Sequence, residues 1–217
     1  MANERTDTRA AHIRGSIYAF LTEAFIRLPD EGFIGNMKSP GTLEFLTNIK
    51  NLKNDKIKSG IMLIEGYINL FEGEDKETYL ESMAVDRTSL IRPVQKGTLK
   101  APYEGLYNKK ENANKIILNV KKFYKKVGIL PYSRAKDSED FFCTQLDFMR
   151  QLCIMEAKDL REDIKDLQKE FLHTHLGSWI GEYCREAIPL AKTDFYKGLL
   201  MFLDGFIELE KQFAGEI

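Results

Sequence analysis

The chain has 217 residues, of which 43 % are hydrophobic and 30 % are charged. This length and apolar content are enough for a hydrophobic core that needs no disulfide or metal to hold it. Because 32 basic and 33 acidic residues give a formal net charge of −1, no overall positive field attracts nucleic acid or an anionic membrane. We therefore expect no nucleic-acid partner.

No segment predicts export, membrane insertion or a cysteine framework. Residues 1–7 lack the basic start and the apolar block of a secretory signal, and no apolar run approaches the roughly 18 to 20 residues of a spanning helix. The three cysteines, Cys143, Cys153 and Cys184, form no CxxC pair, which argues against disulfides and a zinc ribbon. We expect a cytoplasmic protein with reduced cysteines and no stable membrane insertion.

Apolar residues recur at helical spacing along almost the whole chain, which predicts an all-α protein. The expected helices cover residues 13–28, 43–49, 57–71, 75–90, 116–127, 141–153, 160–171 and 195–206. Proline and glycine residues separate them. We expect one single globular helical bundle of about eight or nine helices, formed as one domain by residues 1–217.

A long aromatic loop near residues 92–108 interrupts this helical pattern. Its turn-forming residues are Pro93, Gly97, Pro102 and Gly105. Tyr103 and Tyr107 distinguish it from a plain polar linker. Because a loop of this length is uncommon inside a compact domain unless it has a function or a fixed packing role, we expect it to contribute to a binding site.

Charge is distributed unevenly along the chain. The lysines of one region are Lys96, Lys100, Lys109, Lys110, Lys115, Lys121, Lys122, Lys125 and Lys126. The carboxylates in that region are Glu104 and Glu111, whereas residues 137–170 are rich in Asp and Glu. Such runs are typical of solvated helix faces, and the functional alternative gives each face a charged partner.

The segment from Phe171 to Tyr183 contains the one tryptophan of the chain and two of its three histidines. In a helix, four-residue steps would align Phe171, His175, Trp179 and Tyr183 as one stripe. A purely apolar core helix would not require this mixture of residues. The stripe therefore either packs, binds or catalyses.

Metal chemistry is not supported by the histidines. Residues 170–173 form one ExxH unit, but di-iron bundles use two such units, and His12 has Arg9 three residues before it instead of a glutamate. A mononuclear site is disfavoured because His173 and His175, two residues apart, point to different sides of a helix. We expect no metal and no other cofactor.

Catalytic and nucleotide-binding motifs are not found in the sequence. It contains no GxSxG elbow and neither GxxxxGK[ST] nor GxGxxG. A cysteine nucleophile would need a histidine from another helix, and no pattern specifies that encounter. We expect a protein that is not an enzyme.

Three segments, in this order, resemble the TorD/DmsD/NarJ family of chaperones that assist the maturation of molybdenum-containing oxidoreductases. The family's motifs are a PYES-type loop, a DHxxxELxFM-type helix and an FLxxHLxxW segment. The matching residues are Pro102, Tyr103, Glu104 and Tyr107 in the first motif, Asp140, Leu146, Phe148 and Met149 in the second, and Phe171, Leu172, His175, Leu176 and Trp179 in the third. The departures are Gly105 for serine, Phe141 for histidine, Gln145 for glutamate and Gly181 for proline.

The resemblance implies a TorD-like fold and a cytoplasmic chaperone, monomeric or homodimeric. It would bind the twin-arginine signal peptide, the apo form, or both, of a molybdenum-containing oxidoreductase subunit, and assist cofactor insertion before export. Apolar side chains would contact the peptide and carboxylates its arginines. The residues expected to bind the client are Tyr103, Glu104, Tyr107, Asp140, Asp147, Phe171, His175 and Trp179.

Two alternatives remain open at this point. One is a nucleotide-binding enzyme or switch that uses the helix around Asp140, and the other is a helical scaffold without a peptide groove. For the aromatic stripe we expect mainly a packing role, at a helix junction that holds the Tyr103 loop and the Asp140 segment in place. Contact of the stripe with a client peptide would be secondary.

Overall fold

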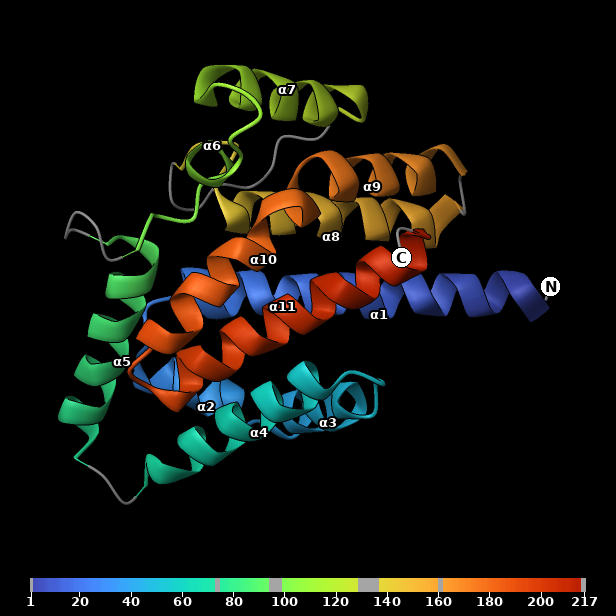
Figure 1. Cartoon of the computed structure of the whole chain (residues 1–217). Helices are drawn as coiled ribbons and strands as arrows, with labels where there is room; N and C mark the ends of the chain where they lie inside the picture. The colour runs from blue at the N-terminus through green and yellow to red at the C-terminus, as the bar shows by residue number, and fades with distance from the viewer. Residues whose placement is uncertain (1, 73–74, 94–98, 129–136, 160–161, 216–217) are drawn as a thin grey trace. The chain divides into compact units, whose positions relative to one another are not determined.

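The computed structural model describes residues 2–72, 75–93, 99–128, 137–159 and 162–215. The regular elements of these residues are all helical, which confirms the predicted all-α class (Figure 1). The α-helices are α1 (Ala2–Ile26), α2 (Glu31–Met37), α3 (Pro40–Lys50), α4 (Asp55–Leu70), α5 (Lys76–Ile91), α6 (Glu104–Tyr107), α7 (Ala113–Lys126), α8 (Phe142–Asp159), α9 (Glu162–Thr174), α10 (Leu176–Ala187) and α11 (Asp194–Ala214). Lys96 and Gly97 lie outside the described residues.

The described residues contain eleven α-helices and one 3₁₀ turn, Ile188–Leu190, slightly more than the number expected. The long periodic segments are where the sequence predicts them. The helices α2, with seven residues, and α6, with four, are too short for apolar periodicity to mark them. The Asp30 side chain starts α2 by accepting a hydrogen bond from the backbone N–H of Phe33.

Two compact units make up the chain. The first contains Met1–Ile26, Pro102–Ile180 and Phe213–Ile217, and the second contains Arg27–Ala101 and Gly181–Gln212. One domain over residues 1–217 stays a prediction. None of the helices in the described part of the chain has the length and apolar character that crossing a bilayer requires.

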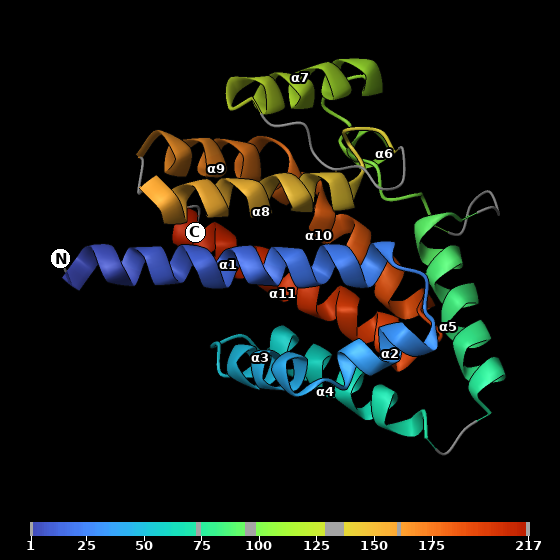
Figure 2. The ribbon, with the colours of Figure 1, turned by 180° about the vertical axis from the view of Figure 1, so that it is seen from behind.

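In the first unit, α1 lies along α8 (Figure 2). A Cβ atom added at Gly15 would lie 3.3 Å from the Cβ atom of Cys153, so these two helices approach closely. Beside this contact, the Arg14 guanidinium donates to Glu156 Oε2 at 3.1 Å and to Gln168 Oε1 at 2.6 Å. A small residue on α1 and a buried polar group therefore set the distance and register of the two helices.

Aromatic rings join α7, α8 and α9 within the same unit. The ring of Phe171, on α9, lies 4.7 Å from the ring of Phe148, on α8, and 5.3 Å from that of Phe123, on α7. Tyr124 packs on Phe148 at 4.5 Å. Since aromatic side chains bury large apolar areas, this cluster is the core that supports the end of α9.

The second unit is built on a close contact between α4 and α11. Gly60 and Gly198 face each other so closely that a Cβ atom on either would collide with the backbone of the other helix. The fully buried Asp86, on α5, accepts hydrogen bonds from the backbone N–H groups of Lys192 and Thr193, just before α11 begins. Glycine packing and a buried cap therefore position α11 within this unit.

Candidate functional site

The aromatic loop pairs with the residues that precede α8. Tyr103 and Phe141 form an isolated antiparallel bridge. The N–H of Glu104 donates to the carbonyl of Asp140 at 2.9 Å, and the N–H of Phe142 donates to that of Pro102 at 3.1 Å. The expectation that Asp140 lies on the helix is therefore wrong. Because the backbone of residues 140–142 is engaged with the loop, α8 begins only at Phe142.

Asp140 supports the short helix α6. Its Oδ2 accepts a hydrogen bond from the N–H of Gly105 at 3.1 Å, while its Oδ1 is buried and has no hydrogen-bond partner in the described structure. A Cβ atom at Gly105 would lie 2.7 Å from the Cβ atom of Ala113, which explains a glycine where the family's motif has serine. With 3 % of its surface exposed, Asp140 gives no support to a nucleotide site built on its carboxylate.

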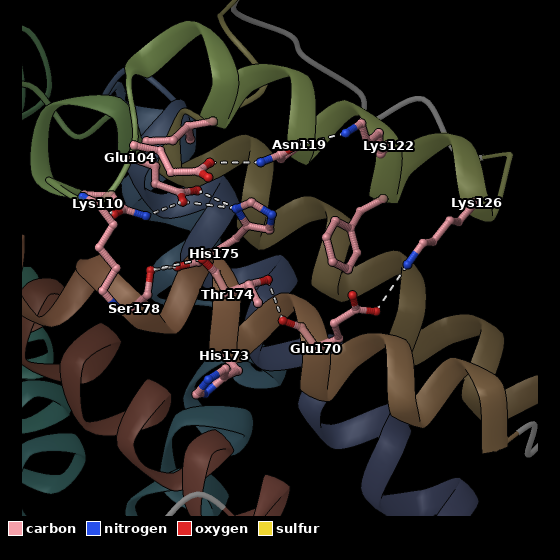
Figure 3. A pocket seen from close by; sticks show the side chains of 14 residues that line it. Glu104, Lys110, Asn119, Lys122, Lys126, Glu170, His173, Thr174, His175 and Ser178 are labelled. Atoms are coloured by element: carbon pink, nitrogen blue, oxygen red, sulfur yellow. Dashed lines mark hydrogen bonds and ion pairs between the residues drawn. The ribbon is translucent and has the colours of Figure 1, made fainter.

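Glu104 is the centre of a buried polar network. Its side chain is fully buried and accepts hydrogen bonds from three residues of the first unit. Asn108 Nδ2 donates to Oε1 at 3.1 Å, and Gln145 Nε2 donates to Oε2 at 2.7 Å. His175 Nδ1 lies 3.0 Å from Oε1 and 3.1 Å from Oε2 (Figure 3).

Two groups that can only donate determine the orientation of both side-chain amides in this network. The indole Nε1–H of Trp179 donates to Gln145 Oε1 at 3.0 Å, so the amide nitrogen of Gln145 faces Glu104. The backbone N–H of Lys110 donates to Asn108 Oδ1 at 3.1 Å, which orients Asn108 in the same way. An ionised Glu104 can only accept, so the bond to His175 then has its proton on the imidazole Nδ1.

Aromatic rings surround this network. The rings of Tyr107 and Trp179 lie 5.5 Å apart, and both side chains are buried. The imidazole of His175 packs on Phe123 at 5.1 Å and on Phe171 at 5.2 Å. These contacts hold the donors at fixed positions around the carboxylate of α6.

The predicted helix junction lies at His175. The helix α9 ends at Thr174 and α10 begins at Leu176, so the residues of the stripe do not share one uninterrupted helix. The carbonyl of His175 still accepts from the N–H and from the hydroxyl of Ser178, at 2.9 and 2.6 Å. The turn thereby directs the imidazole toward Glu104 and away from the axis of α9.

A pocket of about 560 Å³ opens beside His175, between α6, α7 and the end of α9 (Figure 3). Charged side chains that line it include Lys110, Lys122, Lys126, Glu111 and Glu170. A hydrogen bond from Lys115, at 2.6 Å, lowers the pKa of the half-buried Glu111 carboxyl. Burial raises the pKa of the Tyr124 hydroxyl in the neighbouring core well above its usual value, so it stays neutral and donates to the carbonyl of Glu139.

The eight residues expected to bind a client lie in different surroundings. The structure gathers Glu104, Tyr107, His175 and Trp179 in the buried network or in direct contact with it. Tyr103 is half-buried, and its hydroxyl donates to Asp137 Oδ1 at 3.0 Å. The remaining buried positions are Asp140, Phe171 and Asp147. Client contact by these eight residues stays a prediction.

Asp147 lies on α8. Its carboxylate accepts hydrogen bonds from Arg150 at 2.7 Å and from Gln151 at 2.8 Å. Two members of the network, Gln145 and Asn108, were not among the residues that the sequence predicts for the site. The position of Gln145 in the second motif could have indicated its role in the network. The family has glutamate at this position, which can also form a hydrogen bond to a buried partner.

Comparison with known proteins finds a family. Residues 54–185 match the family model described as "Nitrate reductase delta subunit", a range that contains α6, the start of α8 and the His175 junction. The chain is also similar to the perchlorate reductase assembly chaperone protein of Dechloromonas aromatica (strain RCB), with 26 % identity over 113 residues. That similarity covers 50 % of this chain and 50 % of the relative, so it spans half the length of each protein.

Proposed function

Because the chain belongs to the nitrate reductase delta subunit family, we propose that it is an assembly chaperone for a molybdenum-containing oxidoreductase. It acts in the cytoplasm, holds the apo catalytic subunit until the cofactor is inserted, and catalyses no reaction itself. The observation that carries this proposal is the family match over residues 54–185, together with a relative that is itself an assembly chaperone.

The proposal is tested by expressing the full chain in its native host and identifying the proteins that purify with it. We expect the catalytic subunit of a molybdenum enzyme, recovered without cofactor. The same subunit, loaded with its cofactor, should dissociate from the chain. Recovery of the chain without any oxidoreductase subunit, or with only the mature enzyme, contradicts the proposal.

The twin-arginine signal peptide of that client is the proposed ligand. Glu104 is a poor partner for its arginines, because the carboxylate is fully buried and already accepts from three side chains. The half-buried Tyr103 and Leu106, which is 49 % exposed, offer the loop's accessible apolar surface. In this proposal the buried residues of the network keep the loop in shape, and these two side chains contact the peptide.

The arginines would bind instead at an acidic pocket of about 450 Å³ that is lined by residues of α9, of α8 and of the end of α7. Asp163, Asp166 and Glu170 line it together with the apolar side chains of Met155 and Leu167, and Lys126, also in the lining, pairs with Glu170 at 3.2 Å. Carboxylates beside an apolar floor match a peptide in which arginines precede apolar residues. This arrangement supports the α9 pocket as the contact for the arginine pair.

The test compares Asp166→Asn with Glu81→Gln, an exposed carboxylate on α5 in the second unit. Both variants lose one negative charge, so a general electrostatic effect would weaken peptide binding equally. We expect Asp166→Asn to weaken binding of a twin-arginine peptide about threefold to fivefold, and more at low salt, while Glu81→Gln leaves it unchanged. Equal affinities for the two variants contradict the assignment of the arginine pair to this pocket.

A further inference from the structure

The carboxylates that line the pocket beside His175 already have cationic or imidazole partners. Glu104 bonds to His175, Glu111 pairs with Lys115 at 2.6 Å, and Glu170 pairs with Lys126 at 3.2 Å. By contrast, Lys110 and Lys122 line the same pocket and pair with no carboxylate in the described part of the chain. Two positive charges at the pocket are therefore not compensated.

Several of the polar side chains in the lining are already engaged with the protein. The hydroxyl of Ser178 donates to the carbonyl of His175 at 2.6 Å, and that of Thr174 donates to the carbonyl of Glu170 at 2.7 Å. Asn119 Nδ2 donates to Glu111, while its Oδ1 accepts from Lys122 Nζ at 3.1 Å. Asn119 thus positions the Lys122 ammonium group, which retains two further protons to donate.

His175 supplies the buried element of the site. It is 6 % exposed and lines the pocket, and its Nδ1 is bound to Glu104. Because the direction of the network places a proton on Nδ1, the other ring nitrogen, Nε2, is the atom available to a ligand. Across the described residues, Nε2 has no hydrogen-bond partner. A polar side chain that is more than nine-tenths buried therefore points an unused atom into the pocket.

We infer that this pocket binds an oxyanion, the carboxylate or phosphate group of a ligand. The ammonium groups of Lys110 and Lys122 bind the oxygens, and the imidazolium form of His175 is the one that can donate from Nε2 to one of them. Glu104, on the opposite side of the ring, balances the charge of the imidazolium and holds its orientation. The volume of about 560 Å³ lies in the range of about 300 to 1,000 Å³ that is typical of small-molecule sites.

The experiment titrates the full chain with inorganic phosphate and with glutarate at constant ionic strength, because salt alone screens exposed charges. The variants are Lys122→Gln and, as matched control, Lys125→Gln, an exposed lysine of the same helix that does not line the pocket. We expect Lys122→Gln to weaken binding of both anions about fivefold and Lys125→Gln to leave it unchanged. Equal weakening in the two variants, or no saturation by about 10 mM of either anion, overturns the inference.

A second readout follows His175 itself, in the unsubstituted chain, by nuclear magnetic resonance of the imidazole nitrogens. Saturating phosphate should shift the Nε2 resonance while Nδ1 keeps its proton. Binding without a shift of Nε2 overturns the role of His175.

A peptide with two adjacent glutamates, compared with its glutamine counterpart and with free glutarate, identifies the source of the anion. Tighter binding of the glutamate peptide indicates that the ligand is a protein side chain. Tighter binding of glutarate indicates a free small molecule. If neither the peptides nor glutarate displace phosphate, the site is overturned.

Discussion

The direction of the hydrogen bonds around Glu104 can be tested by a double-mutant cycle of Glu104→Gln and Trp179→Phe. Glutamine has the shape of glutamate, but one of its two terminal groups is a donor. If the NH₂ group of the new glutamine takes the place of Oε2, it faces the NH₂ group of Gln145, which lies 2.7 Å from Oε2 in the parent chain. If it takes the place of Oε1, it faces the NH₂ group of Asn108, which lies 3.1 Å from Oε1. Gln145 cannot turn over because Trp179 donates to its oxygen.

The expected magnitudes follow from counting buried groups without partners, each of which costs about 1 to 3 kcal/mol. Glu104→Gln leaves two donors facing each other. Trp179→Phe leaves one acceptor, Gln145 Oε1, without its donor, and adds the cost of a smaller ring. In the double variant Gln145 can turn over and accept from the new glutamine, so one group rather than three lacks a partner. Because two fewer groups lack a partner, the double variant should be more stable by about 2 kcal/mol or more than the sum of the single effects predicts.

Urea unfolding followed by circular dichroism measures the cycle, because Trp179→Phe removes the one tryptophan of the chain. As a control, Glu104→Gln is combined with Thr22→Val, which removes a buried hydroxyl on α1 that donates to the carbonyl of Tyr18. This second cycle should be additive within about 0.5 kcal/mol. If the effects of Glu104→Gln and Trp179→Phe on the free energy of unfolding also add within about 0.5 kcal/mol, Trp179 does not set the direction of the hydrogen bonds around Glu104.

Four further outcomes are expected. Trp179, with 2 % of its surface exposed, should emit at the short wavelengths of a buried indole and keep its spectrum when a twin-arginine peptide binds; a clear shift at saturation would mean that it contacts the peptide. Glu104→Ala should lower the melting temperature and weaken peptide binding equally at low and high salt, whereas a loss confined to low salt would indicate a direct contact with arginine. Asp86→Ala removes the acceptor of two backbone N–H groups before α11 and should cost about 2 to 4 kcal/mol of unfolding free energy, with a thermal melt equal to that of the parent chain counting against this. Gly60→Ala should destabilise by about 2 kcal/mol or more because its Cβ atom meets the backbone of α11, while Gly66→Ala, on the same helix and with no neighbour within 4 Å, should be neutral or stabilising; equal effects of the two substitutions would contradict the close contact.

Much of the fold follows from local patterns in the sequence. The periodic apolar residues between Ile57 and Phe71 predict a helix, and α4 covers Asp55–Leu70. A helix of this length buries the same face at every turn, so its residues carry the signal several times. The four-residue α6 contains barely one turn, and its contacts come from Asp140 and Phe141, far along the chain. No local pattern could reveal it.

For the candidate site, too, the sequence indicated some residues, and only the packing of the chain showed how they contact one another. The motifs indicated Glu104, His175 and Trp179 as residues with a shared role, but Glu104 lies 71 positions before His175 and 41 before Gln145 in the chain. Which of them is buried, and which bonds to which, depends on how α6, α8 and the α9 junction pack. Burial makes Glu104 the acceptor that organises the loop, and its contact with a client's arginine stays a prediction.

The sequence by itself determined the all-α class, the positions of the long helices and the family resemblance, because apolar periodicity and motif residues can be recognised from the order of residues alone. Only the tertiary structure decided where α8 begins, why residue 105 is glycine, and that the Trp179 indole orients Gln145 toward Glu104. It also decided that two lysines and an unused imidazole nitrogen meet at one pocket. The physical reason is that hydrogen-bond partners, burial and charge compensation are properties of side chains brought together by packing, and they have no period or spacing in the sequence.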